Sequence, residues 1–481
     1  MEKILIIDKS ASGRVGINLP PVDVPETDPT TIFADRYFRR SEPRLPEVSE
    51  PEVARHYIGL STKNHHVDKD FYPLGSCTMK YNPKINDAVA ALPGFAGIHP
   101  AQPEETVQGA LQLLWELEQQ LKAVTGMSRF TLQPSAGAQG ELVGVFIMKK
   151  YHEKRGNSGK THILIPDSAH GTNPASVAIG GFQTRQVKSG PDGLVDIEDL
   201  KANLDDSVAG MMLTQPNTLG LFESNICEIT ELIHSVDGLM YMDGANLNAL
   251  IGIVRPLDMG FDIVHINLHK TFSTPHGGGG PGAGPIGVVE QLVPYLPVPR
   301  VEKSGADYRL NYDGPDSLGR IHGFYGNFGV LVRAYTFIKS MGEKGLRDMT
   351  RNAIVNANYL MRCLNGKYEV AYPGHCMHEF VITARGQKER GGRALDIAKR
   401  LLDHGFHAPT IYFPISVPEA MMIEPTESES RETLDRFAAT MLAIDEEIDR
   451  DPNILLQAPT KTPVRRLDET TANRNPNLRW S

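Results

Sequence analysis

Apolar residues recur at helical spacing in an early segment of this 481-residue chain. Over 106–125 they return at steps of three and four, which predicts a helix with Glu104 and Glu105 near its start and Gly126 at its end. Farther along, Glu141–Lys154 also has the length and composition of a helix. The apolar positions of the first helix are Val107, Leu111, Leu114, Leu117, Leu121 and Val124.

Between about 130 and 290, short apolar runs alternate with helical stretches such as Ile226–Val236. Strand–helix alternation predicts a mostly parallel sheet with helices on both faces, the α/β class. In such sheets ligands bind beyond the carboxyl ends of the strands, which is where we expect the chemistry. The predicted strands are His162–Ile165, Gly210–Leu213, Leu239–Met242 and Phe261–Ile266.

The pattern divides the chain into four regions. Residues 1–60 are rich in proline and predict an extended N-terminal arm, with a disordered tail as the alternative. Residues 61–325 form a large α/β domain, 326–450 a smaller α+β domain, and 451–481 an irregular tail. In the smaller domain we expect helices at Phe328–Lys339, Glu343–Leu364, Gly392–His404 and Glu427–Asp449, and strands at Glu369–Tyr372 and Glu379–Thr383.

Composition narrows the classes of protein. The chain is 40% hydrophobic and 22% charged with a net charge of −9, which argues against nucleic-acid binding and extensive disorder. Apolar runs are too short for a signal or a membrane span, so we expect no membrane association. Four scattered cysteines fit a reducing cytoplasm, with an isolated regulatory disulfide as the alternative.

Two polar residues at neighbouring strand ends carry the main hypothesis. Asp243 follows a strongly apolar strand, so it needs a cationic or donor partner, and a protonated pyridine nitrogen is one. The alternative is that Asp243 caps a helix starting near Asn246. Lys270 follows the next strand, 27 residues later, and its amine is a candidate Schiff-base nucleophile for pyridoxal phosphate (PLP). A surface lysine is the alternative.

Further residues fit a phosphate and an aromatic ring. The small residues Ser135, Ala136 and Gly137 open a helix, where free amides favour an anion, although a plain helix start looks the same. No Walker or Rossmann spacing is present. His170 follows another strand and suits stacking on a ring, although a lone histidine is more often structural.

Two other features are set aside. His265 and His269 have the spacing of a helical zinc pair, but this segment is predicted as a strand, where they would lie ~13 Å apart, so no metal site is expected. The glycine run 276–282 lacks the lysine of a P-loop and predicts a turn passing close to cofactor or substrate, or else an inert loop.

The chain resembles the glycine decarboxylase (P-protein) family of the glycine cleavage system. The resemblance is most specific over His269–Gly282, and it extends to Leu74–Pro83 and Gly326–Gly329. It covers about 20–470 and matches the second, catalytic subunit of the two-subunit form, since Lys270 is present. In the fused form two such halves share one chain, so the length implies a separate first subunit.

The resemblance implies an aspartate aminotransferase-like fold (fold type I) with PLP bound to Lys270. Glycine would displace Lys270 and lose carbon dioxide, and its aminomethyl group would pass to the lipoyl arm of the H-protein. By matching position, His170 would stack on the ring and Asp243 would pair with its nitrogen. The phosphate would be held at 135–137. Other expected cofactor contacts are Ala245 on the opposite ring face and, less specifically, Thr214, Asn217 and His269.

The family form also implies an assembly with two copies of each subunit. Two rival hypotheses stay open at this point: another PLP enzyme, such as a desulfurase or an amino-acid decarboxylase, and a non-catalytic scaffold. Carbon dioxide exchange with glycine would distinguish a glycine decarboxylase from another PLP enzyme. Bound PLP would exclude a non-catalytic scaffold. Around Ser76–Asn82 the family suggests a loop near the substrate entrance, with a structural turn as the alternative.

Overall fold

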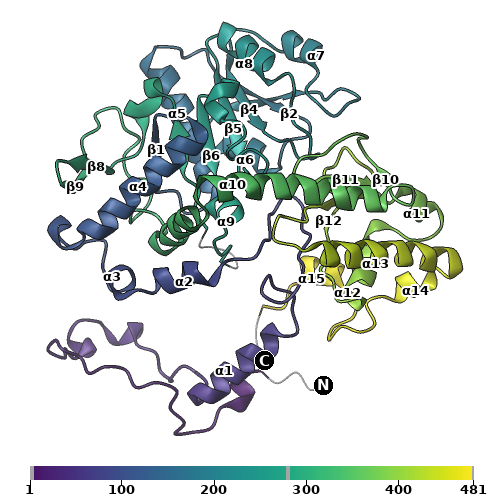
Figure 1. Ribbon diagram of the computed structural model, residues 1–481. Helices are drawn as coiled ribbons and strands as arrows, with labels where there is room; N and C mark the ends of the chain where they lie inside the picture. Colours follow the sequence, from purple (N-terminus) through teal and green to yellow (C-terminus); the bar gives the residue numbers. More distant parts are fainter. Residues whose placement is uncertain (1–4, 278–281, 479–481) are drawn as a thin grey trace. The chain divides into compact units, whose positions relative to one another are not determined.

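The computed structural model describes residues 5–277 and 282–478 (Figure 1). Its contacts divide the chain into two units, Met1–His65 and His66–Ser481. In the described part, no helix combines the length and the apolar character that crossing a membrane requires. The four cysteines are free thiols.

The N-terminal unit consists of extended chain with four short helical segments. Their bounds are η1 (Ile7–Lys9), η2 (Pro29–Thr31), η3 (Asp35–Tyr37) and α1 (Glu50–Ser61). The sequence prediction missed α1, although Ser49 and Glu52 form a capping box at its start. Most of the unit's apolar side chains are exposed, including Ile17, Leu19 and Leu45.

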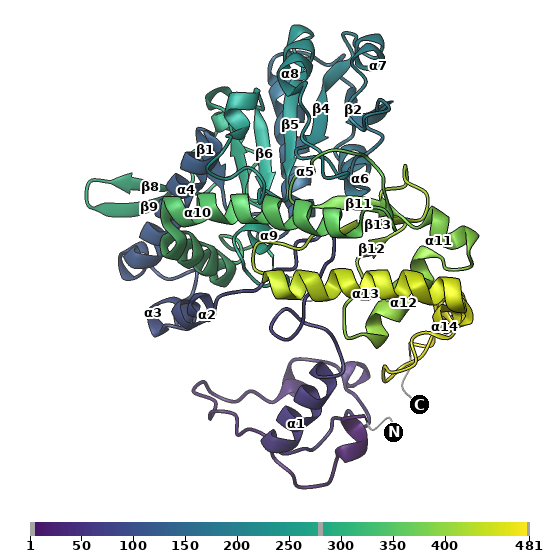
Figure 2. The same ribbon diagram turned by 45° about the vertical axis from the view of Figure 1, so that its right-hand side comes forward.

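The larger unit is built on a seven-stranded sheet with the order β1-β7-β6-β5-β4-β2-β3 (Figure 2). The strands from β3 to β6 are parallel, whereas β7 runs antiparallel to both β6 and β1, so the predicted mostly parallel sheet is confirmed. The bounds are β1 (Arg129–Thr131), β2 (His162–Pro166), β3 (Gln183–Val187), β4 (Val208–Thr214), β5 (Leu239–Gly244), β6 (Ile263–Ile266) and β7 (Ile286–Val288).

Alternation of side chains along β5 explains why the sheet is covered on both faces. Met240 and Met242 join one apolar core, whereas Leu239 and Tyr241 join another, because successive side chains of a strand point to opposite faces. The helices of this region are α4 (Gln108–Thr125), α5 (Gly137–Lys154), α6 (Thr172–Ile179), α7 (Ile197–Ala202) and α8 (Ile226–Ser235).

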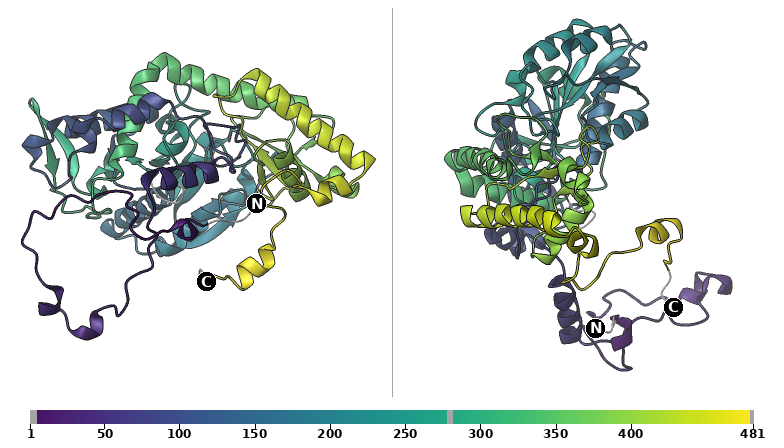
Figure 3. Two further views of the ribbon diagram at one scale, coloured as in Figure 1. Left: turned by 90° about the horizontal axis from the view of Figure 1, so that it is seen from below. Right: turned by 90° about the vertical axis from the view of Figure 1, so that its right-hand side faces the viewer.

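The C-terminal part contains a four-stranded antiparallel sheet with the order β10-β11-β13-β12. Its long helix α10 (Phe328–Leu364) is interrupted at Gly342, where φ is 62°, so the two predicted helices are both present. Helices α10 and α13 (Arg431–Arg450) pack together (Figure 3). The remaining bounds are β10 (Glu369–Val370), β11 (Phe380–Thr383), β12 (Thr410–Ile411), β13 (Ala420–Ile423), α11 (Arg385–Glu389) and α12 (Ala394–Asp403).

Shorter elements complete the chain. The hairpin β8 (Arg300–Ser304) and β9 (Asp307–Asn311) stands apart from the two larger sheets. The others are α2 (Lys84–Ala90), α3 (Pro93–Ala96), η4 (Glu104–Thr106), η5 (Pro256–Met259), α9 (Leu268–Thr271), η6 (Glu290–Tyr295), α14 (Asn453–Gln457) and α15 (Glu469–Arg474).

Three local predictions were wrong. The tail beyond Asp451 contains α14 and α15 and is therefore not wholly irregular. The segment from His265 to His269 is not one strand: β6 ends at Ile266, as predicted, and His269 and Lys270 lie on the single turn of helix α9. The strand predicted over Glu369–Tyr372 ends at Val370.

Candidate active site

A cavity of about 240 Å³ opens at the carboxyl ends of β4, β5 and β6. Eight of the ten predicted site residues line it: Lys270, Asp243, His170, Gly137, Ala245, Thr214, Asn217 and His269. Ser135 and Ala136 do not belong to its lining, whereas Ala138, one residue into α5, does. The structure thus gathers side chains spread over more than 130 residues of sequence, as the parallel sheet requires.

Asp243 is a buried carboxylate surrounded by donors. Its Oδ2 accepts a hydrogen bond from the Asn173 amide at 3.1 Å, and its Oδ1 accepts one from the Ala245 N–H at 3.1 Å. His265 Nε2 lies 3.3 Å from Oδ1. Burial alone would raise the pKa of Asp243, but His265, these hydrogen bonds and the charge of Lys270 together lower it below the ordinary value. Asp243 is therefore an anion.

The helix-cap explanation of Asp243 was wrong. Residues 245–255 form turns and loops, so no helix starts at Asn246. His265 is oriented from behind by the Tyr241 hydroxyl, which lies 2.8 Å from its Nδ1. Strands β5 and β6 pair so that Asp243 lies opposite His265. The pairing of two adjacent strands therefore fixes the surroundings of the carboxylate.

Lys270 reaches the cavity from α9, directly after β6. Its Nζ donates a hydrogen bond to the Ser76 carbonyl at 2.7 Å. Ser76 has a φ of 66°, a left-handed conformation that is uncommon for a residue other than glycine. The loop around Ser76 thus supplies the acceptor that holds the amine in the cavity. The sequence prediction for Ser76–Asn82 was only a loop near the substrate entrance.

The start of α5 faces the cavity through Gly137 and Ala138. A Cβ at Gly137 would lie 2.4 Å from Oδ1 of Asn267, so no larger residue fits there without displacing that side chain. First-turn amides of a helix have no partner inside it and favour an anion. Ser135 is engaged within the turn, since its hydroxyl donates to the Gln139 side chain at 3.0 Å.

His170 and His269 line the cavity in different settings. His170 Nδ1 lies 2.9 Å from the Thr172 hydroxyl, and its ring makes an edge contact with Phe413. His269 Nδ1 accepts a hydrogen bond from the Ala283 N–H at 3.2 Å. Burial, together with the nearby His276 and Lys270, lowers the pKa of His269 to about 3, so its ring is neutral.

Asn217 serves the backbone of its own turn. Its amide donates to the Gly193 carbonyl at 2.9 Å, and its Oδ1 accepts from the N–H groups of Leu219 and Leu221. Its hydrogen-bonding groups are therefore already used. Thr214 differs, because its buried hydroxyl has no hydrogen-bond partner within the described structure.

Buried polar groups around the cavity fit a polar aromatic cofactor such as PLP. The Thr214 hydroxyl and Oδ1 of Asn267 are both buried without a partner inside the described residues, which is costly unless a ligand supplies one. Three further features of the cavity match the parts of PLP. The amine of Lys270 suits the carbonyl, the carboxylate of Asp243 suits the pyridinium nitrogen, and the start of α5 suits the phosphate. Its volume is small beside the ~300–1,000 Å³ of drug-sized sites, which favours a compact ligand.

Several residues of the site were missed from sequence. Glu141, His378 and Glu379 line the cavity, and so does Asn267. Ser76, from the loop expected near the substrate entrance, lines it as well. Glu141 accepts hydrogen bonds from the hydroxyls of Thr172 and Ser176, and it lies on α5 at the cavity side. His378 and Glu379 come from the C-terminal part, more than 100 residues after Lys270. No local pattern marks them, because their position depends on the tertiary fold.

The glycine run predicted to pass near the cofactor is described only in part. Residues 278–281 lie outside the described residues, whereas His276 and Gly282 lie inside them. A Cβ at Gly282 would lie 2.5 Å from Nδ1 of His269, which agrees with a close backbone approach there. His276 Nε2 lies 2.9 Å from the Thr78 carbonyl, so the run begins against the Ser76 loop.

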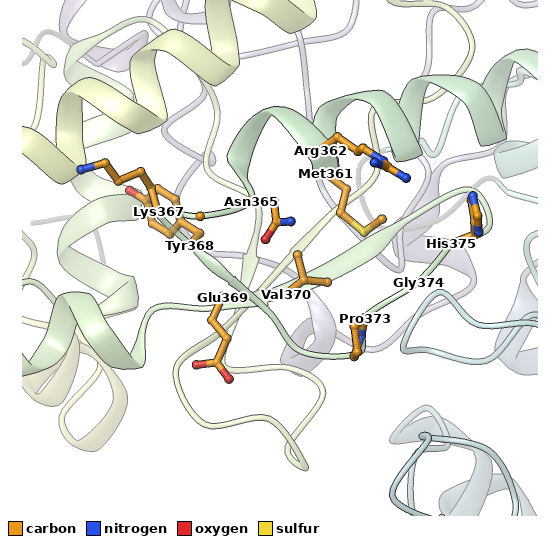
Figure 4. Close-up of a pocket in the computed structure, with 11 residues that line it drawn as sticks. Met361, Arg362, Asn365, Lys367, Tyr368, Glu369, Val370, Pro373, Gly374 and His375 are labelled. Atoms are coloured by element: carbon orange, nitrogen blue, oxygen red, sulfur yellow. The ribbon is translucent and has the colours of Figure 1, made fainter.

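A larger cavity of about 590 Å³ lies in the C-terminal part, away from these residues. Figure 4 shows Met361, Arg362 and Asn365 at the end of α10, and His375 on the loop that follows β10. None of the predicted site residues lines this cavity. Its size alone does not make it the active site, because catalysis needs convergent reactive groups.

The fold and the cavity define the class: this is an enzyme fold of the PLP-dependent fold type I group. A crystal structure of glycine decarboxylase (P-protein) of the glycine cleavage system, in inhibitor-bound form, superposes with a TM-score of 0.71 at 19% identity, covering 86% of this chain and 92% of that chain. An aspartate aminotransferase from Thermus thermophilus superposes with a TM-score of 0.57 at 11% identity, covering 79% of this chain and 100% of that one.

Sequence comparison then gives the family. The model of the glycine cleavage system P-protein matches residues 24–304, and that of the glycine dehydrogenase C-terminal domain matches 349–460. A probable glycine dehydrogenase (decarboxylating) subunit 2 from Chloroherpeton thalassium is 58% identical over 485 residues, covering 100% of this chain and 98% of the relative. The chain belongs to the glycine cleavage system P-protein family.

Proposed function

We propose that this chain is the PLP-bearing subunit of a glycine dehydrogenase (decarboxylating). It removes carbon dioxide from glycine and passes the aminomethyl group to the lipoyl arm of the H-protein. The observation that carries the proposal is that Lys270 and Asp243 line one cavity, in a chain 58% identical over its full length to a probable subunit 2. PLP, when bound, supplies an electron sink for negative charge at the amino-acid carbon.

Lys270 would hold the cofactor through its amine, at the position that the amino group of glycine would then take. The Ser76 carbonyl, 2.7 Å from Nζ, gives the freed amine an acceptor and keeps it in the cavity. Asp243 would pair with the ring nitrogen and keep it protonated, because an anion stabilises a neighbouring cation in a low-dielectric site. Asn173 and His265 hold the carboxylate in place.

His170 would stack on the cofactor ring, and Ala245 would pack on the opposite face. Gly137 and Ala138 would place the first-turn amides of α5 where they can hold the phosphate. Thr214 and Asn267 supply polar atoms that have no partner inside the described protein. Ser135 and Ala136 shape the turn before α5, and Asn217 shapes the turn after β4.

The name shared by the relatives implies a first subunit as partner. We further place the chain in the cytoplasm, in an assembly with two copies of each subunit that receives lipoylated H-protein.

The test uses the complex co-expressed with its first subunit. We expect an absorbance band of bound PLP that glycine changes, exchange of labelled carbon dioxide with glycine that depends on lipoylated H-protein, and a borohydride-fixed adduct on the Lys270 peptide by mass spectrometry. We expect Lys270→Ala to lack the adduct and to exchange carbon dioxide ~10²–10⁴-fold more slowly than the wild type. Exchange by Lys270→Ala at the wild-type rate would refute the assignment.

A further inference from the structure

Two buried glutamates meet beside the active-site cavity. Glu379 directly precedes β11 and Glu424 directly follows β13, and these antiparallel strands pair Phe380 with Ile423. Their side chains are buried, with residue exposures of 3% and 0%. A carboxylate oxygen of each and a ring nitrogen of His378 all lie within 4.8 Å of one another. Strand pairing thus holds two acidic groups together.

The partners of this pair are almost all uncharged. Glu424 accepts hydrogen bonds from the Thr78 hydroxyl at 2.9 Å, from the Asn246 amide at 3.1 Å and from the Asn248 amide at 3.3 Å. Glu379 Oε2 accepts from the Ser76 N–H at 2.7 Å. Across residues 5–277 and 282–478, no lysine or arginine forms an ion pair with either glutamate. The pair therefore lacks a direct counter-ion.

Two adjacent carboxylates without a counter-ion share a proton. Burial raises the pKa of Glu424 to about 8, with the charge of Glu379 adding to the effect, and burial raises the pKa of Glu379 to about 7. Burial, with the charge of Lys270, lowers the pKa of His378 to about 3, so this ring is neutral. Burial also raises the pKa of the Cys77 thiol, which faces both glutamates.

Glu379 reaches the reacting groups through Ser76. The Ser76 N–H binds Glu379 and the Ser76 carbonyl binds Lys270, so this one residue contacts both. Glu379 also lines the cavity, whereas Glu424 lies behind it. The other carboxylates of the lining are engaged: Asp243 faces Asn173 and His265, and Glu141 accepts from two hydroxyls. Glu379 Oε1 lies 3.7 Å from Nε2 of His378.

The proposed reaction has a proton to move at each end. Glycine enters as an ammonium ion, and its nitrogen needs a free electron pair before it can attack. When the lipoyl disulfide opens, one sulfur takes up the aminomethyl carbon and the other leaves with an electron pair. The second sulfur then needs the proton that the first step released.

We propose that Glu379 is the acid–base group that takes the ammonium proton of glycine and returns it to the leaving sulfur, with Glu424 as its positioning partner. The N–H bond breaks toward the Glu379 carboxylate. Departing carbon dioxide leaves an electron pair on the carbon, and this pair forms the carbon–sulfur bond. The electron pair of the broken sulfur–sulfur bond stays on the second sulfur, which takes the stored proton. The disulfide is the oxidant and no other reagent is needed. The pair ends in the protonation state in which it began. This inference rests on the proposed function.

The first test is kinetic and uses the PLP-loaded complex with its first subunit. We expect Glu379→Gln, which keeps the shape but cannot accept a proton, to lower the rate of aminomethyl transfer by ~10²–10⁴-fold. In the wild type, kcat/KM rises with pH as the pair of Glu379 and Glu424 loses its shared proton. This rising limb of the pH profile is absent in Glu379→Gln. Glu424→Gln keeps the limb but moves it to lower pH, because Glu379 then ionises without a neighbouring charge. The groups facing the pair are Lys270, His378, Cys77 and, on the far side of Thr78, His276.

A second test counts protons and does not depend on turnover. Glycine is titrated calorimetrically into the complex without H-protein, in two buffers that differ in heat of ionisation. The wild type keeps the ammonium proton inside the protein, whereas Glu379→Gln releases it to the buffer. Glu429→Gln is the matched control, because burial raises the pKa of Glu429 to about 7 but Glu429 lies outside the cavity lining. It should behave as the wild type does.

The outcomes separate the two ideas. If the wild-type complex fails to exchange carbon dioxide with glycine, the proposed function is wrong. If it exchanges and Glu379→Gln matches its rate and pH profile, or if the wild type already releases the proton on binding glycine, Glu379 does not have this role. Unchanged PLP absorbance and an unchanged Tm show that the variants are folded.

Discussion

At the scale of single residues, the site depends on which buried carboxyl groups are stabilised as anions. Asp243 is buried yet ionised because Asn173, the Ala245 N–H and His265 surround it. Glu379 and Glu424 are equally buried and also accept hydrogen bonds, but burial outweighs these bonds and the charge of Lys270, so the pKa of both is raised. The surroundings of these buried carboxyl groups thus shift their pKa values in opposite directions.

The first prediction concerns the charge of Asp243. We expect Asp243→Asn to weaken PLP binding by ~10–100-fold, because a hydrogen bond to a charged partner contributes ~1.5–3 kcal/mol. Absorbance titration of the apo complex with PLP measures this. The control is Asp262→Asn, which removes a buried carboxylate paired with His234 at 2.8 Å outside the cavity. It should lower Tm and leave PLP affinity in place; equal affinity of both variants would contradict the assignment of Asp243.

The second prediction concerns stability and pH. The folded pKa of Glu424 is raised from 4.5 to about 8, so the unfolded chain gives up this proton at lower pH than the folded one. The contribution of Glu424 to stability is therefore complete below pH 4.5 and is lost as pH rises through about 8. We expect the free energy of unfolding of the apo protein to fall with pH across this window, and Glu424→Gln to have a shallower slope. Parallel slopes would contradict the shared proton.

At the scale of elements, the site depends on how closely α5 approaches the sheet. Gly144 lies on the buried side of α5, and a Cβ there would lie 2.1 Å from the ring of Tyr241 on β5. Gly140 is similarly close to the Gly284 carbonyl. The small residues of α5 thus let the helix start, with Gly137 and Ala138, reach the cavity that Asp243 enters from β5.

The third prediction tests this approach. We expect Gly144→Ala to destabilise the protein by ~1–3 kcal/mol through overpacking against Tyr241 and to weaken PLP binding as α5 shifts. Gly109→Ala on α4 is the control, since a Cβ there meets no atom within 4 Å. It should leave stability unchanged or raise it by up to ~1 kcal/mol. Thermal unfolding measures the stability of both variants. A Gly144→Ala protein as stable as the control would show that a Cβ fits between α5 and Tyr241.

At the scale of the whole molecule, the N-terminal unit is the part that does not bury its own apolar side chains. Ile17 is 79% exposed and Leu19 83%, in a unit whose one buried apolar side chain among the described residues is Val48. Exposed apolar residues at this density are typical of a surface that another chain covers. We therefore expect this unit to contribute to assembly with the first subunit that the relatives' name implies.

The fourth prediction follows from that assignment. We expect Leu19→Asp to weaken the complex at least tenfold, because burying a charge at an apolar contact costs more than ~1.4 kcal/mol. Light scattering coupled to gel filtration measures the mass of the complex, which should be that of two copies of each subunit in the wild type. Val355→Asp, at a 61% exposed position on α10, should leave assembly intact. Assembly of Leu19→Asp like that of the wild type would contradict the assignment.

The sequence alone determined the local elements and the chemistry of the strand ends. Apolar periodicity predicts α4, α8, α10 and the parallel strands, because helix and strand place side chains at different periods. It also predicts that Asp243 and Lys270 face one crevice, since the carboxyl ends of neighbouring parallel strands meet at one edge. Short elements were less predictable: α9 was not predicted after the strand that ends at Ile266, because a single turn has no period to detect.

Only the tertiary structure decided the rest of the site. Ser76, Glu379 and Glu424 are separated from each other and from Lys270 by tens to hundreds of residues, and each alone looks like an ordinary surface residue in the sequence. They meet because β11 and β13 pair and bring the Ser76 loop against Lys270. Local sequence specifies periodicity and reactive groups, but burial and charge pairing are properties of distant segments that pack together, and these lower the pKa of Asp243 and raise those of Glu379 and Glu424.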